Sequence, residues 1–300
     1  ETATGTVIFE KNADERREVA SITKLMTALL VLEALDRDEI ALTDSVQISP
    51  RAAAMKGSQA LLDASAVYPL EDLLRTTIMA SANDSAVALS EYIAGSEENF
   101  VDRMNRRAAE LGMTNTNYVN CTGYPQSGQY TTARDVCRLC CEIAKHPRYN
   151  QYASVWIDKL THPSGRVTDL TNTNRLVRFY EGCDGYKTGS TDAAKYCLAA
   201  TAEKNGMRLV AIVLGTPVSQ TRFNEARQML DYGFATYRRV VIANKGDLLG
   251  QNVEVRGGSA ESVPLALGSG LSMLLKNGQQ SGLSLSVQLP ESVDAPIAQG

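Results

Sequence analysis

The stretch Ala20-Ser21-Ile22-Thr23-Lys24-Leu25-Met26-Thr27 opens an apolar run, and the rest of the chain is interpreted from it. In a helix, Ser21 and Lys24 would lie on one face, one turn apart. A lysine can accept the proton of a serine hydroxyl when burial disfavours its charged form, so Ser21 is a candidate nucleophile and Lys24 its activator. The alternative is an ordinary helix start, with Ser21 as N-cap and Lys24 in solvent.

The predicted helix that contains Lys24 is apolar on nearly every side. Its large apolar residues are Ile22, Leu25, Met26, Leu29, Leu30, Leu32 and Leu35, and Ala28, Val31 and Ala34 fill the other faces. A helix of this kind belongs in a core. Ser21 and Lys24 would therefore lie at the buried end of a rigid central element with limited access to water.

Composition sets the limits on class and partners. With 300 residues, 44% of them hydrophobic, the chain is long enough for one large globular domain and a small one. A net charge of −4 gives no basic footprint for nucleic acid. No run of about 18 apolar residues predicts a membrane span. The first residue is not methionine, which suggests a trimmed or mature form.

The six cysteines include a cluster, Cys137, Cys140 and Cys141, at helical spacing. No second cysteine pair and no nearby histidine completes a tetrahedral ligand set, so we interpret the cluster as small buried core residues. His146 and His162 each precede a proline in loop-like sequence. The sequence therefore predicts neither a metal site nor a cofactor.

A second pair of polar residues lies between two predicted helices. Pro69 is placed at the first position of a helix that ends near residue 80, and Asn83 or Asp84 would cap the next one. Helix capping explains these two residues but leaves Ser81 without a task. Ser81 and Asn83 are therefore candidate functional groups held in a tight turn.

The sequence predicts β strands at both ends of the chain and helices in the middle. Strands are predicted over 5–10, 184–190, 195–202 and 207–214, with shorter ones near Trp156 and Val167. Asn205-Gly206 is a strong hairpin signal, and a helix over 220–237 would cover the sheet. Thr132 with Asp135 resembles a capping box for a helix that Pro147 ends. This order favours an α+β fold over a doubly wound one.

Beyond Val241 the composition changes to Gly, Ser, Val and Leu, with alternation over 252–255 and 283–289. We predict a large domain over 1–240 and a small β-rich domain over 241–300. The final residues contain no closing element, so the small domain is expected to be incomplete.

Three motifs now stand in order along the chain: Ser21-x-x-Lys24, Ser81-x-Asn83 and Lys187-Thr188-Gly189. The first two are weak alone, but their order and settings, namely a buried helix start, a turn between helices and a strand beside glycines, match a known set. Four further stretches also resemble sequences of the proteins that carry this motif set: Asn12-Ala13-Asp14, Thr131-Thr132-Ala133-Arg134-Asp135, Asn172-Thr173-Asn174-Arg175-Leu176 and Arg222-Phe223-Asn224-Glu225. The chain resembles the low-molecular-weight penicillin-binding proteins that are D-alanyl-D-alanine carboxypeptidases, most of all the sporulation-associated branch of clostridia and bacilli.

The resemblance implies a β-lactamase/transpeptidase-like fold: an antiparallel sheet flanked by helices, an all-helical lobe and a small C-terminal β domain. It also implies catalytic roles. Ser21 would attack the carbonyl of the penultimate D-alanine, and Lys24 would accept its proton. Ser81 and Lys187 would pass a proton to the leaving amine and stabilise charge.

The same resemblance implies a set of substrate-binding residues. Asn83 would hold the peptide amide, and Gly189 would line the site within the third motif. Thr188 and Arg222 would bind the terminal carboxylate, a task that suits a planar guanidinium. The oxyanion would lie between the backbone N–H groups of the nucleophile and of Ser190.

The implied partners are peptidoglycan stem peptides and β-lactam antibiotics, at an extracytoplasmic location, with peripheral membrane attachment in a full-length protein. Two rival functions differ in class. A serine β-lactamase of class A would need a Glu-x-x-Leu-Asn run, which the sequence lacks. A non-catalytic peptidoglycan-binding scaffold would not need Ser21, Lys24 and Lys187 intact.

Overall fold

A computed structural model describes residues 1–279, 282 and 287–296. The chain divides into two compact units, Glu1–Gly233 and Phe234–Gly300. The domain boundary at 240/241 stays a prediction from composition. None of the helices in the described ranges is both long and apolar enough to cross a bilayer.

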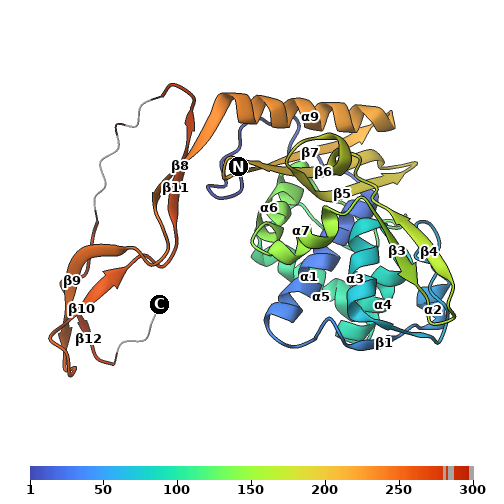
Figure 1. The fold of residues 1–300 in the computed structure, drawn as a ribbon, viewed down its shortest axis with the longest axis horizontal. Coiled ribbons are helices and arrows are strands. Elements are labelled where there is room, and N and C mark those ends of the chain that lie inside the picture. Colours follow the sequence, from blue (N-terminus) through green and yellow to red (C-terminus); the bar gives the residue numbers. More distant parts are fainter. Residues whose placement is uncertain (280–281, 283–286, 297–300) are drawn as a thin grey trace. The chain divides into compact units, whose positions relative to one another are not determined.

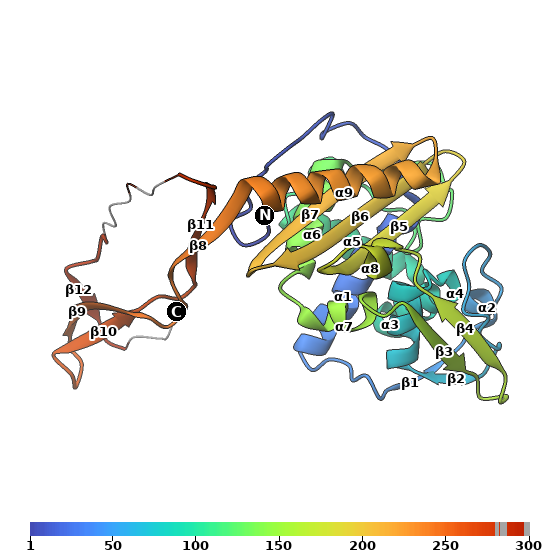
Figure 2. The ribbon, with the colours of Figure 1, turned by 45° about the horizontal axis from the view of Figure 1, so that its top comes forward.

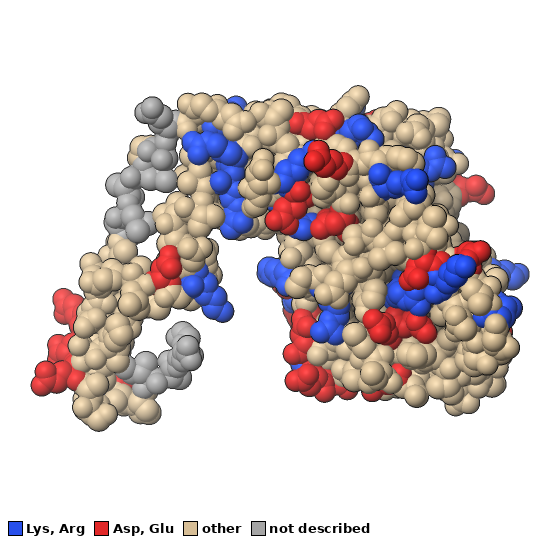
Figure 3. Space-filling model, in the orientation of Figure 1, with Lys and Arg blue, Asp and Glu red and all other residues tan. Residues whose placement is uncertain are grey.

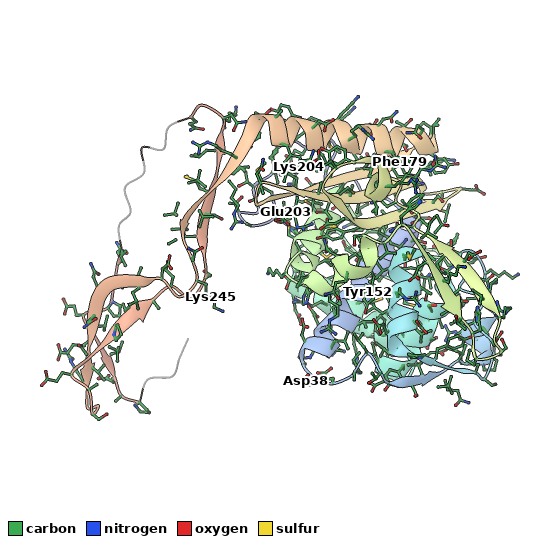
Figure 4. The ribbon with its side chains drawn as sticks, in the orientation of Figure 1. Asp38, Tyr152, Phe179, Glu203, Lys204 and Lys245 are labelled. Atoms are coloured by element: carbon green, nitrogen blue, oxygen red, sulfur yellow. The ribbon has the colours of Figure 1, made fainter. Side chains whose placement is uncertain are left out.

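The first unit contains a helical lobe built around α1 (Figure 1). Its helices are α1 Lys24–Asp36, α2 Pro50–Ala53, α3 Leu70–Met79, α4 Asn83–Ala94, α5 Glu97–Glu110, α6 Ala133–Ile143 and α7 Pro147–Ala153. The short 3₁₀ helix η1, Ala20–Thr23, precedes α1. Helix α1 is buried on nearly every side, as its composition predicts. Tyr152 of α7, which is labelled in Figure 4, donates to Glu71 of α3 at 2.9 Å, and this hydrogen bond links the two helices.

An antiparallel sheet completes the first unit. Its strands are β5 Cys183–Thr191, β6 Lys195–Lys204 and β7 Met207–Thr216, in the order β5-β6-β7. Asn205 and Gly206 join β6 to β7 with positive φ at both positions, as the hairpin signal predicts. Helix α9, Ser219–Thr236, lies over one face of the sheet, and the helical lobe covers the other (Figure 2). The α+β prediction is confirmed.

Smaller elements flank the lobe. Strands β1 Ser45–Gln47 and β2 Val67–Pro69 pair with each other, as do β3 Ile157–Thr161 and β4 Val167–Thr171. The second pair confirms the strands expected near Trp156 and Val167. The one-turn helix α8, Leu176–Phe179, precedes β5.

The strand predicted over 5–10 is wrong. This segment forms no strand in the described structure, and Val7 and Phe9 are 54% and 60% exposed. The N–H of Thr2 donates to the carbonyl of Arg208 at 3.1 Å, but among the described residues no backbone hydrogen bond joins residues 5–10 to β7. A strand-like composition alone does not make a strand without the backbone hydrogen bonds of a partner.

Three predicted helix termini also differ. Pro69 is the N-cap of α3 rather than its first residue, and Asn83 is the first residue of α4, with Ala82 at the N-cap. Pro147 begins α7, whereas the preceding helix already ends at Ile143. The expected cap at Thr132 is confirmed, since its hydroxyl accepts the N–H of Asp135 at 3.1 Å.

The second unit consists of β strands. Strand β8, Tyr237–Ala243, pairs with β11, Leu271–Lys276. Strand β9, Leu248–Arg256, lies between β10, Ser262–Ala266, and β12, Ser292–Asp294. The alternation over 252–255 falls within β9, but residues 283–286 of the second alternating run lie outside the described residues.

Charges of both signs are interspersed over the face of the first unit shown in Figure 3. Within the first unit, opposite charges also pair locally: Arg75 lies 2.6 Å from Asp72, and Arg208 lies 2.7 Å from Asp184. This face is unlike the one-signed basic surface of a nucleic-acid-binding domain.

Candidate active site

The serine and lysine of the first motif are in contact. Lys24 Nζ lies 3.0 Å from Ser21 Oγ and donates to the carbonyl of Thr122 at 2.8 Å. Ser21 lies in η1 rather than in an α-helix, and side chains three residues apart eclipse in a 3₁₀ turn. The alternative in which Ser21 is an N-cap and Lys24 is solvated is therefore wrong.

Burial prepares Lys24 to act as a base. The side chain is 1% exposed, and burial lowers the pKa of Lys24 to about 7, opposed only in part by Cys121 and the Asp84 carboxylate. A substantial fraction of this amine is therefore neutral at physiological pH. The burial expected from the apolar helix is confirmed.

The carbonyl that accepts from Lys24 belongs to a closely packed loop. Asn120 Oδ1 accepts the N–H groups of Gly123 at 2.7 Å and of Thr122 at 3.2 Å. Gly123 has φ +76°, and a Cβ there would lie 1.9 Å from the carbonyl oxygen of Ala20. Sequence reasoning missed this partner because a backbone carbonyl 98 residues from Lys24 carries no side-chain signal.

The second motif lies between α3 and α4. Ser81 is buried with φ 64°, and among the described residues no hydrogen bond links its hydroxyl to Ser21 or Lys24. The amide nitrogen of the Asn83 side chain donates to the carbonyl of Lys56. Its Oδ1 is buried and has no partner within the described structure. An unpaired buried acceptor of this kind is suited to a donor from a ligand.

The third motif brings a second buried amine to the site. Lys187 is 1% exposed, and its Nζ donates to the carbonyl of Thr188 at 3.2 Å. Burial is the main cause of a pKa of Lys187 well below its usual value, and Lys24 and Arg222 lower it further. The two buried amines, Lys24 and Lys187, are therefore close enough to disfavour each other's charge.

Strand β5 presses directly on the turn that bears the nucleophile. A Cβ at Gly189 would lie 2.3 Å from the carbonyl of Val19 and 3.1 Å from the backbone nitrogen of Ser21. Only glycine permits this approach. Thr188 beside it is buried, and Ser190, the next residue along the strand, is exposed. The structure thus brings the third motif against the first.

Arg222 reaches the same strand from α9. Its Nη1 donates to the carbonyls of Gly189 at 3.0 Å and Cys197 at 3.2 Å. Its Nε is buried and has no partner among the described residues. In this state the guanidinium braces β5 and β6, and its predicted contact with a substrate carboxylate stays a prediction.

One group in the described part of the chain has metal-ligand spacing: Glu33, Glu142 and His146, whose ligand atoms lie within 4.8 Å of one another. Arg107 pairs with both carboxylates, at 2.8 and 3.1 Å. The guanidinium already offsets part of their negative charge. Glu33 also lies nine residues beyond Lys24 on α1, or about 13 Å along the helix, so the group is not part of the serine site.

The sequence of the chain matches the model of a known family, and this match decides how the arrangement of residues is interpreted. The sequence model described as D-alanyl-D-alanine carboxypeptidase matches residues 1–218, which include all three motifs. The chain belongs to this carboxypeptidase family. A second model, for the C-terminal domain of penicillin-binding protein 5, matches residues 237–300.

Individual relatives match most or all of the length of this carboxypeptidase. The D-alanyl-D-alanine carboxypeptidase DacF of Bacillus subtilis is 37% identical over 100% of this chain and 77% of its own. Penicillin-binding protein 5 of Haemophilus influenzae superimposes with TM-score 0.83 at 30% identity, over 98% of this chain and 86% of that one. Penicillin-binding protein D2 of Listeria monocytogenes, solved in an ampicillin-bound form, has TM-score 0.66 at 32% identity, over 78% and 93%.

The structure adds one residue to the site of this carboxypeptidase. Asp84, fully buried behind Asn83, accepts the N–H groups of Ala60 at 2.9 Å and Leu62 at 3.1 Å. It also accepts the N–H of Ser85 at 2.9 Å. The carboxylate therefore fixes the segment whose preceding carbonyl, from Lys56, holds the Asn83 amide. The sequence suggested only a helix cap at Asp84, which is wrong.

Asp84→Asn is expected to shift the acidic limb of the pH profile of kcat/KM to lower pH. The Asp84 carboxylate raises the pKa of Lys24, so removing its charge lets burial lower that pKa further. An asparagine also cannot accept both N–H groups with the same side-chain atoms, which costs about 1–3 kcal/mol of stability. Titration of acylation rate against pH, with thermal unfolding, measures both effects.

Asp135→Asn is the matched control. Asp135 is equally buried at a helix start and accepts the backbone N–H of Asn115 at 2.9 Å. Its replacement should cost similar stability and leave the acidic limb in place. An unchanged limb in Asp84→Asn would show that Asp84 supports the fold only.

Proposed function

We propose that this chain is a serine-type carboxypeptidase that removes the terminal D-alanine from peptidoglycan stem peptides through an acyl-serine intermediate. The observation that carries the proposal is a fully buried Lys24, of pKa about 7, with its Nζ 3.0 Å from Ser21 Oγ. The family match supplies the reaction class.

Acylation begins at Ser21. Its Oγ forms a bond to the carbonyl carbon of the penultimate D-alanine while Lys24 Nζ takes the hydroxyl proton. The carbonyl oxygen becomes an oxyanion, which the backbone N–H groups of Ser21 and Ser190 stabilise. Each such donor lowers the barrier by roughly 3 kcal/mol. The close approach of Gly189 to Ser21 supports this pairing of donors from two elements.

The C–N bond breaks next. Ser81 and Lys187 pass a proton to the leaving nitrogen, and the terminal D-alanine departs. Water then hydrolyses the acyl ester, returning Ser21 to its free form. The lowered pKa of the buried Lys187 supports a role in proton transfer.

Substrate binding uses the groups around this centre. The unpaired Oδ1 of Asn83 accepts a peptide N–H. Thr188, Gly189 and Arg222 form the end of the site that takes the terminal carboxylate. Arg222 contributes its positive charge and the unpaired Nε, which gains a partner when an anion binds.

β-Lactams acylate the same serine in this proposal, which the ampicillin-bound relative supports. The reaction takes place outside the cytoplasm, where peptidoglycan lies, with peripheral membrane attachment in a full-length protein and a role in sporulation. Residues 241–300 form the small β domain, which acts as a spacer. These assignments rest on the family resemblance.

The test is D-alanine release from diacetyl-L-Lys-D-Ala-D-Ala, with and without prior treatment with penicillin. We expect release by the untreated enzyme and its loss after acylation. The half-life of the penicilloyl adduct separates the rival enzyme, because slow hydrolysis indicates a peptidase and rapid turnover a β-lactamase. Penicillin binding without D-alanine release would contradict the carboxypeptidase function.

A further inference from the structure

Helix α6 carries two cysteines that the reaction does not use. Cys137 and Cys141 are one helical turn apart on α6, and both are partly exposed. The expectation that they are buried core residues is therefore wrong. It holds for Cys140 between them, which is fully buried.

The surroundings favour a thiolate at Cys137, whereas interaction with Cys137 and burial raise the pKa of Cys141 and keep it a thiol. Arg134 and Arg138 lie on the same helix and stabilise negative charge on Cys137. Interaction with the Cys141 thiol is the main cause that holds the pKa of Cys137 below its usual value; burial opposes it, and the N-terminal amine and the two guanidiniums add to it. A thiolate is the form of cysteine that binds soft ions and attacks electrophiles.

The spacing of Cys137 and Cys141 on α6 allows one ligand atom to bond to both sulfurs. Residues four apart on a helix have Cβ atoms about 5–6 Å apart on one face. The single metal-competent group of three or more side chains within the described ranges, Glu33 with Glu142 and His146, contains no cysteine. A two-sulfur site of this kind does not supply the four protein ligands of structural zinc. The pair suits an atom that prefers sulfur and needs only two protein ligands.

We propose that Cys137 and Cys141 form a dithiol site for trivalent arsenicals. An organoarsenic oxide, R–As=O, would react with both thiols to form two As–S bonds. The As=O bond breaks, and its oxygen leaves as water with the two thiol protons. No electron is transferred, so the step needs no oxidant. The product is a ring that closes over one turn of α6.

Phenylarsine oxide tests the site on the full chain. We expect one adduct per molecule by intact mass, removed by dithiothreitol but retained in the monothiol 2-mercaptoethanol. Cys137→Ser and Cys141→Ser should each weaken binding by roughly 100-fold or more, because a second, intramolecular thiol contributes an effective concentration advantage of that order.

Cys140→Ser is the matched control, since it removes the buried neighbour and should leave the adduct unchanged. Acylation of every variant by fluorescent penicillin verifies folding. Loss of the adduct in Cys140→Ser, or its retention in the Cys137→Ser/Cys141→Ser double variant, would place the arsenic elsewhere and overturn the proposal.

Discussion

Ser21→Ala is expected to abolish both labelling by fluorescent penicillin and release of D-alanine. An alanine has no oxygen to form the acyl ester, and no other hydroxyl is within hydrogen-bonding distance of Lys24 Nζ among the described residues. Loss of a serine nucleophile reduces turnover by about a millionfold in enzymes of comparable chemistry. Residual activity should therefore be below detection in a gel-based label and in a D-alanine assay.

The control is Ser164→Ala, which removes an exposed hydroxyl on the β3–β4 hairpin. Its labelling should equal that of the unmodified protein. The free energy of unfolding of Ser164→Ala should fall by only about 0.5–1.5 kcal/mol, the cost of the exposed hydrogen bond from Ser164 to Asp63. Ser21→Ala protein that is folded yet still labels would disprove the assignment of the nucleophile.

Lys24→Met is expected to slow acylation by roughly 10²–10⁴-fold, the contribution typical of a positioned general base. The same lysine sets the pH dependence of the unmodified enzyme. Because the pKa of Lys24 is about 7, the acylation rate should fall about tenfold per pH unit below that value. The variant should lose this acidic limb, which stopped-flow acylation across pH measures directly.

The same substitution is expected to stabilise the fold. A lysine with pKa about 7 when folded and 10.5 when unfolded binds its proton more weakly in the folded state. Between these values stability rises with pH, and below about 7 the fold carries the full penalty, about 5 kcal/mol. Methionine removes this burial penalty but leaves the Thr122 carbonyl unpaired, which costs about 1–3 kcal/mol.

The net gain should thus be roughly 2–4 kcal/mol at pH 6 and should shrink as pH approaches 10.5. Denaturant unfolding at both pH values measures it. Lys145→Met is the control, because that lysine is exposed on the surface and its loss should have little effect at either pH. If the Lys24→Met protein were less stable than the unmodified protein at pH 6, burial of the charged amine would not destabilise the fold.

The sequence could predict what rests on periodicity and local chemistry. The apolar run after Lys24 predicted a buried central helix, and Asn205-Gly206 predicted the hairpin of β6 and β7. Ser21 and Lys24 were found because their spacing is a property of any helical turn. In each case the physics lies within a few consecutive residues.

What the sequence could not predict depends on backbone groups from distant segments. The carbonyl of Thr122 and the amides bound by Asp84 have no residue signature. The expected first strand failed for a related reason, because a strand depends on the neighbour that pairs with it. Capping failed at Asn83 and Asp84, where both side chains reach across to the segment over 56–62.

The loop that binds the Lys24 amine determines which substitutions move the acceptor of that amine. The acceptor is a main-chain oxygen, so replacing the Thr122 side chain cannot delete it. Its position depends instead on Gly123, where any Cβ would meet the carbonyl of Ala20. The alignment of the base is therefore encoded at a residue that has no functional group. A substitution at 122 removes a buried hydroxyl that accepts the N–H of Tyr124 but leaves the acceptor of Lys24 in place, whereas a side chain at 123 would displace that acceptor.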